Sequence, residues 1–188
     1  MKAFEEAVAL LQRGRPGAAA ARAEAAKALA PRSGAVRELL GISLYQAERY
    51  REALRELQTY RRITGRADQN HLIADSHRAL GAPEKAVGPA QEALRTRAVP
   101  EEARAEAAIV GASALADLGR YDEALALLRT FPTREQAVRP FDIRVWYVSG
   151  DVLERAGRKR EAAREFRKVI RHDAGAFDAA ERLARLGG

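Results

Sequence analysis

The amino-acid sequence predicts an all-α protein built from repeated helical hairpins, and three observations support this prediction. A short turn-like pattern occurs five times, each copy lies between two segments with helical periodicity, and bulky apolar side chains are few. Of the 188 residues, 41 are alanine, so the hydrophobic content of 47% overstates what one deep core could bury. Stacked hairpins need only a thin core between neighbouring helices.

The repeated pattern is six residues long and ends in alanine every time. Its copies span residues 14–19, 48–53, 81–86, 119–124 and 157–162. The final alanines are 34, 33, 38 and 38 residues apart, a period too long for a coiled coil and suited to a helical hairpin. A small side chain at this place allows two antiparallel helices to approach closely.

The second copy shows the flanking helices well, because apolar residues recur on one helical face on both sides of the turn. These residues are Val36, Leu39, Leu40 and Leu44 before the turn, and Ala53, Leu54, Leu57, Tyr60 and Ile63 after it. The glycine that opens most copies is expected to end the first helix with a positive φ angle. Each unit is therefore predicted to hold two amphipathic helices.

This pattern divides the chain into a single domain of five hairpins and a final helix. The expected repeats are approximately 1–33, 34–66, 67–100, 101–138 and 139–174, followed by a capping helix within 175–188. The two longer spacings predict an extended connection over residues 129–140 and a lengthened helix that starts at Pro100. In the final helix, expected over 177–186, we predict that leucines cover the last hairpin and that Arg182 faces water. Eleven helices and no strand result.

The chain resembles the tetratricopeptide repeat family at the positions that define its consensus. The matching residues are Leu40, Gly41, Tyr50, Ala53 and Leu57 in the second unit, Leu118, Gly119, Tyr121, Ala124 and Leu128 in the fourth, and Trp146, Gly150, Gly157, Ala162 and Phe166 in the fifth. Ala7 and Ala74 stand where glycine is usual, and the consensus proline survives only as Pro31. The resemblance implies a right-handed superhelix with first helices on the concave side and a non-enzymatic adaptor that binds a protein or peptide.

The family's concave positions, projected onto this chain, name a peptide groove. They are Tyr45, His71, Asp75, Arg78, Asp117, Arg144, Tyr147, Asp151 and Arg155. Tyrosines would cover apolar side chains of a peptide, while carboxylates and guanidiniums would pair with its charges. The chain lacks the Lys and Asn clamp by which some members hold a C-terminal carboxylate. A simpler interpretation is that these residues form ordinary solvated helix faces.

The net charge of +7 and the sequence pI of 10.1 raise a second possibility. Arg160, Arg164, Arg167 and Arg171 recur at helical spacing beside Lys168, forming a basic stripe that could follow the phosphates of RNA or of an RNA-containing complex such as the ribosome. Three points count against this alternative: the stripe has no interleaved aromatic residue, Glu161 and Glu165 can pair with it, and GC-rich codon usage also enriches arginine. Self-association through the terminal helices is a third possibility.

The remaining features exclude several function classes. Without cysteine the chain has no disulfide framework and no thiolate site. It has no apolar run of membrane-spanning length and no leader-like start, so we expect no membrane partner and a cytoplasmic location. His71 and Asp75 are the best pair of metal ligands, and two ligands make a poor site. No phosphate loop or catalytic motif occurs, so we expect no enzyme and no cofactor.

Overall fold

The computed structural model of the protein describes residues 2–187, and these residues form eleven α-helices and no strand. The helices are α1 (Lys2–Gln12), α2 (Pro16–Leu29), α3 (Gly34–Gln46), α4 (Tyr50–Thr64), α5 (Asn70–Ala79), α6 (Pro83–Arg95), α7 (Glu101–Asp117), α8 (Tyr121–Arg129), α9 (Pro140–Arg155), α10 (Lys159–His172) and α11 (Ala179–Arg185). The all-α prediction is confirmed.

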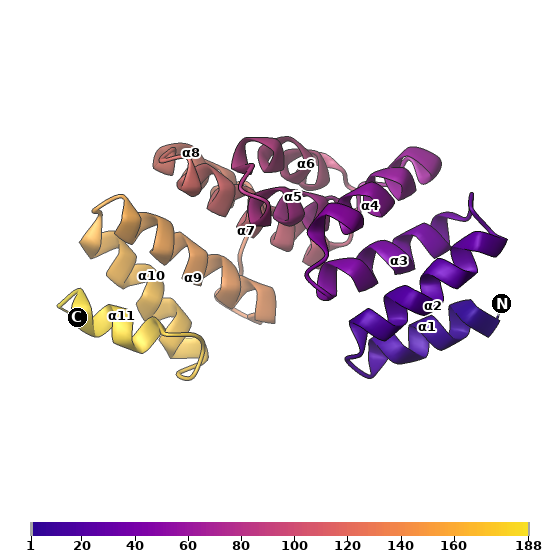
Figure 1. Ribbon diagram of the computed structural model, residues 1–188. Coiled ribbons are helices and arrows are strands. Elements are labelled where there is room, and N and C mark those ends of the chain that lie inside the picture. Colours follow the sequence, from indigo (N-terminus) through magenta and orange to yellow (C-terminus); the bar gives the residue numbers. More distant parts are fainter. Residues whose placement is uncertain (1, 188) are drawn as a thin grey trace.

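Helices α1 to α10 form five antiparallel pairs that follow one another in a right-handed superhelix. Figure 1 shows these pairs side by side along an arc, with the N-terminal and C-terminal helices at its two ends. Each helix packs against its partner in the pair and against the next pair, and α11 packs against α10. Because contacts are made only with near neighbours in the sequence, the core is distributed along the arc.

The turns within the pairs have the backbone that the sequence predicts. Gly14, Gly81, Gly119 and Gly157 all have φ between 66° and 74°, in the left-handed region. Glu48 takes the same place in the second turn with φ of 59°, where a side chain is unfavourable. The alanine that ends every copy of the pattern is fully buried, which agrees with its predicted role at the closest approach of two helices.

Helices α9 and α10 of the last pair approach each other closely at Gly150 on α9. A Cβ atom at this position would lie 2.7 Å from Cε1 of Phe166 on α10. Phe166 is itself fully buried and belongs to the largest apolar cluster, which extends from α7 to α11. The glycine is therefore required by the phenylalanine ring packed against it.

The two insertions lie where the sequence predicts them. Helix α7 starts directly after Pro100 and has 17 residues, whereas α8 has only 9 and is followed by an extended connection to Pro140. The connection is fixed at its end by Arg139, which donates 2.6 Å and 2.7 Å hydrogen bonds to the fully buried Asp142. Although burial raises the pKa of Asp142, the hydrogen bonds from Arg139 lower it below its usual value.

The structure corrects three details of the sequence prediction. Ile63 was expected on the buried face of α4 but is 39% exposed, because it lies in the last turn, beyond the helices that cover the rest of α4. Helix α11 begins at Ala179 rather than at residue 177, since Phe177 has a φ of 57° that cannot continue a helix. Arg182 was expected in water, yet its side chain is 11% exposed and forms ion pairs with α9.

Candidate functional site

The odd-numbered helices line the inside of the arc. The first helices of successive pairs pack against each other, α5 against α7 and α7 against α9. The second helices α6 and α8 lie along the outside of the arc and do not pack against each other to the same extent. Elements on the inner side of a curved stack lie closer together than those on the outer side. The side chains that project from the inner face of α3, α5, α7, α9 and α11 are thus brought into one row.

At its N-terminal end this row starts with Tyr45 on α3. The Tyr45 hydroxyl donates a 2.6 Å hydrogen bond to Oδ2 of Asp75 on α5. Burial and this hydrogen bond raise the pKa of Tyr45 above its usual value, so the hydroxyl stays a donor. Arg78, one turn further along α5, lies 3.4 Å from Asp75 Oδ1 and donates through Nε to Asp117 Oδ2 at 2.6 Å.

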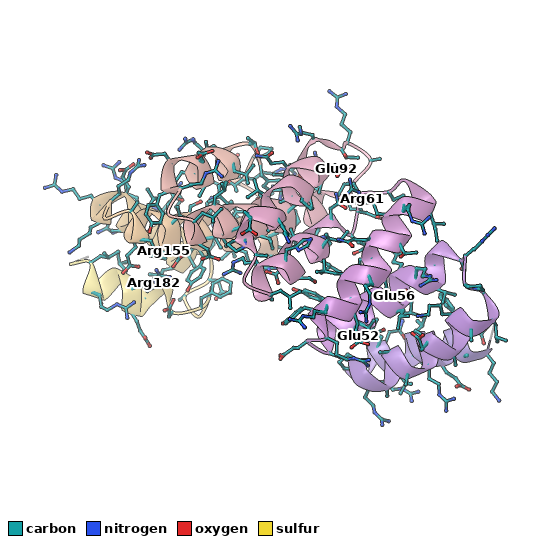
Figure 2. All side chains as sticks on the ribbon, turned by 45° about the horizontal axis from the view of Figure 1, so that its top comes forward. Glu52, Glu56, Arg61, Glu92, Arg155 and Arg182 are labelled. Carbon is teal, nitrogen blue, oxygen red and sulfur yellow. The ribbon has the colours of Figure 1, made fainter. Side chains whose placement is uncertain are left out.

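The row continues on α7, α9 and α11. Arg155 donates two 3.2 Å hydrogen bonds to Asp117 Oδ1 and lies 3.8 Å from Asp151 on its own helix. Arg182 then donates to Asp151 Oδ1 and to Glu154 Oε2, both at 2.7 Å. Figure 2 shows Arg155 and Arg182 near each other at the C-terminal end of the molecule. We call the following residues the inner ladder: Tyr45, Asp75, Arg78, Asp117, Arg155, Asp151 and Arg182.

The other residues predicted for the groove lie beside the inner ladder and have partners of their own. Tyr147 donates a 2.6 Å hydrogen bond to Asp178, and its ring lies 4.4 Å from that of Phe177. Arg144 pairs with Glu106 on α7 through a 2.7 Å hydrogen bond. His71 points back to its own segment, with Nδ1 3.0 Å from the Asp68 carbonyl oxygen, and burial lowers the pKa of its ring.

The inner face differs in chemistry between its two ends. On α1, the half-buried side chains Phe4, Val8 and Leu11 pack at the edge of an apolar cluster, together with Tyr45 and Leu72. From α5 onward the inner ladder makes the face polar and charged. The inner face is therefore apolar at its N-terminal end and carries alternating charges over the rest of its length.

Sequence reasoning missed Arg182 and Glu106, and it did not foresee that the predicted groove residues pair with one another. One signal for these pairs was present in the sequence. Asp117 and Arg155 are 38 residues apart, and so are Glu106 and Arg144. The fourth and fifth copies of the turn pattern are separated by the same number of residues. An acid and a base separated by one repeat period occupy neighbouring places on successive helices of a solenoid.

The basic stripe lies on the outer side of α10. Arg160, Arg164, Arg167 and Arg171 are exposed, and none has a carboxylate oxygen within 4.0 Å among the described residues. Lys168 pairs with Glu165 at 3.1 Å and with Glu135 at 3.7 Å. The predicted pairing of the stripe with acids therefore holds for Lys168 but leaves the four arginines available.

The structure also bears on metal binding and on membrane-spanning helices. Over residues 2–187, no three histidine, aspartate or glutamate side chains gather closely enough to hold a metal ion. In the same part of the chain, every helix is too short or too polar to cross a bilayer.

Comparison with known proteins gives consistent matches to one kind of repeat. Family models described as tetratricopeptide repeats match residues 4–69 and 71–175. TTC0263, a thermophilic TPR protein in Thermus thermophilus, is 20% identical, with 98% of this chain and 97% of that chain covered and a TM-score of 0.71. A tetratricopeptide repeat protein from Parabacteroides merdae is 18% identical, with coverages of 98% and 71% and a TM-score of 0.74.

A third solved structure carries a functional description. YrrB, described as a TPR protein with an unusual peptide-binding site, is 20% identical, with 95% of this chain and 89% of that chain covered and a TM-score of 0.68. At these identities the likeness to the solved structures shows the fold alone. No curated protein matches the chain.

Proposed function

Because the chain belongs to the tetratricopeptide repeat family, we propose that it is a non-enzymatic scaffold whose inner face binds an extended segment of a partner protein. The family fold supports a general role in protein–protein interaction. The peptide-binding site described for YrrB is consistent with such a role on the same fold.

The observation that carries this proposal is the continuous row formed by the inner ladder. Neighbouring helix axes lie about 8–10 Å apart, so the row from α3 to α11 is about 35 Å long. An extended peptide of about ten residues has this length. The side chains of Asp75, Asp117 and Asp151 are 25%, 30% and 32% exposed, so a segment laid along the inner face would meet them.

The inner ladder retains hydrogen-bonding capacity although its members pair with one another. A carboxylate has about four acceptor sites, and Asp75 and Asp117 each receive only two or three hydrogen bonds within the protein. A guanidinium has about five N–H donors, of which Arg78 uses two. The amide and carbonyl groups of a bound backbone can therefore be satisfied, while the apolar end at Phe4 and Leu72 would receive apolar side chains.

Affinity capture with matched variants tests the proposed face. Ser113 lies half-buried on α7, one helical turn before Asp117 on the same face, and takes no part in the inner ladder, so Ser113→Arg adds bulk to the inner face. Gln58 is exposed on the second helix α4, and Gln58→Arg adds the same side chain outside the groove. Proteins captured from cell extract by the wild type and by Gln58→Arg should be lost from Ser113→Arg. Equal capture by both variants would contradict the proposal.

The cytoplasmic location stays a prediction.

Binding of nucleic acid to the basic stripe also stays a prediction. The affinity for RNA through Arg160, Arg164 and Arg167 would fall steeply as the salt concentration rises. The affinity for a segment bound along the inner ladder would fall less, because the charges of the inner ladder are nearly balanced. Nuclease treatment before capture separates the two cases. Loss of every partner after nuclease treatment would favour the RNA alternative, and retention of partners favours the scaffold.

A further inference from the structure

A cleft of about 390 Å³ lies on the outer side of the molecule between α8 and α10, and we call it the outer cleft. Its floor is apolar and comes from Leu128 on α8 and from Trp146 and Leu153 on α9. The cleft exists because α8 has 9 residues whereas α10 has 14, so α8 is shorter by about 7 Å and leaves part of α9 without a covering helix. The inserted connection after α8 closes one end at Pro132.

The edge of the outer cleft carries an excess of positive charge. Four basic residues and two acids line it, namely Arg129, Arg158, Arg164, Lys168, Glu161 and Glu165. The two acids already pair with neighbouring bases, since Glu161 lies 2.7 Å from Arg158 and Glu165 lies 3.1 Å from Lys168. Arg129 and Arg164 have no carboxylate oxygen within 4.0 Å in residues 2–187.

The corresponding cleft between α2 and α4 provides an internal comparison. It has a volume of about 450 Å³ and is lined by three bases, Lys27, Arg49 and Arg55, and three acids, Glu24, Glu52 and Glu56. All six take part in ion pairs, at distances from 2.6 Å to 4.0 Å. Figure 2 shows Glu52 and Glu56 along α4 on this side. Ion pairing therefore leaves no basic residue free in the cleft between α2 and α4, whereas it leaves Arg129 and Arg164 free at the outer cleft.

From this combination we infer that the outer cleft binds a second protein segment, one with an apolar side chain flanked by aspartate or glutamate. The apolar side chain would rest on the small exposed part of the floor formed by Leu128, Trp146 and Leu153, and the acidic residues would accept hydrogen bonds from Arg129 and Arg164. Guanidinium groups bind carboxylates with a matching planar geometry. This site is separate from the inner ladder, so the inference does not depend on the proposed groove.

The contents of the cleft favour a peptide over nucleic acid. Unpaired bases bind to proteins by stacking on exposed aromatic rings. The aromatic residues at the outer cleft are Trp146 and Phe131, which are 3% and 4% exposed and so offer no ring face to a base. Glu161 and Glu165 also interrupt the basic surface along which a phosphate backbone would lie.

Fluorescence anisotropy with a defined probe tests the inference. The probe is a labelled peptide with a Leu-Phe pair between two runs of glutamate, and its control replaces Leu-Phe by Ser-Ser. The double variant Arg129→Glu/Arg164→Glu should weaken binding of the probe at least about tenfold, because it removes two charge-assisted hydrogen bonds. Arg55→Glu/Arg49→Glu in the other cleft makes the same charge change and should alter the affinity less than about twofold.

A second variant tests the apolar floor without changing charge. Ser149 lines the outer cleft from α9, and Ser149→Phe would fill it while leaving both arginines in place. This variant should also reduce binding at least about tenfold, with its folding checked by circular dichroism. Equal binding of the Ser-Ser control, equal loss in the two double variants, or no binding of the probe to the wild type would overturn the inference. So would binding of labelled oligouridylate that is tighter than that of the probe and is lost in Arg129→Glu/Arg164→Glu.

Discussion

Replacing Gly150 with alanine should destabilise the last helical pair, although alanine is the better helix former. The new Cβ atom would lie 2.7 Å, 2.9 Å and 3.0 Å from three atoms on one edge of the Phe166 ring. The ring cannot move aside easily, because it is fully buried between the ring of Tyr147, 5.9 Å away between centroids, and the Arg182 guanidinium, 4.8 Å above it. The substitution therefore overpacks the interface between α9 and α10.

The expected magnitude is the difference between two opposing effects. Overpacking a well-packed core costs about 1–3 kcal/mol. Replacing glycine by alanine within a helix gains about 1 kcal/mol. The free energy of unfolding should thus fall by up to about 2 kcal/mol, which for a chain of this size lowers Tm by up to about 8 °C.

Thermal and urea unfolding followed by circular dichroism measure this change. Gly17→Ala on α2 is the matched control, because a Cβ atom there meets nothing within 4 Å, and it should raise the stability by up to about 1 kcal/mol. In a double-mutant cycle with Phe166→Leu, the cost of Gly150→Ala should decrease by at least about 1 kcal/mol. A stabilising Gly150→Ala, or a cycle without coupling, would refute the reasoning.

Three further predictions concern stability. Glu48→Gly should raise the free energy of unfolding, measured in urea, by about 1 kcal/mol, because glycine adopts the left-handed φ of 59° at this position without strain. Gly119→Glu should lower the free energy of unfolding by a similar amount. Opposite signs would contradict the turn geometry. Arg182→Met should lower the free energy of unfolding by about 2–3 kcal/mol, because it removes the 2.7 Å partner of Asp151 and the 2.6 Å partner of Glu154. An equal effect of the exposed substitution Arg185→Met would disprove a specific role. Burial lowers the pKa of His71, so the unfolded chain binds a proton more readily than the folded protein. Tm should therefore decrease as the pH falls through about 6.5, the usual pKa of histidine, and it should decrease less in His71→Gln. An identical pH profile of Tm for the two proteins would exclude this contribution.

The local part of the fold could be predicted from the sequence because its causes are local. A glycine that ends one helix and an alanine at the helix crossing are requirements that recur in each unit, and they placed the five turns correctly. The start of α11 was wrong because Phe177 adopts a left-handed backbone in contact with Tyr147 on α9. No pattern within the final segment encodes this contact.

The candidate site was only partly predictable for the same reason. Helical spacing places Asp75 and Arg78 on one face of α5, and the repeat places that face on the inside of the arc. Whether these charged groups stay unpaired on the surface or form ion pairs with one another depends on distances between helices from different repeats. The hydrogen bonds from Tyr45 to Asp75 and from Arg78 to Asp117 span 30 and 39 residues, and the structure was needed to find them.

Site-specific photo-crosslinking in the native cell tests most directly whether the inner face is where a partner protein binds. A photoreactive phenylalanine analogue would be placed at Ser113 on the inner face of α7 and, in a separate protein, at the exposed outer residue Gln58. The account predicts a discrete protein adduct from position 113 that persists after nuclease digestion, with none from position 58. Adducts from position 58 alone, or products at position 113 that disappear with nuclease, would contradict it.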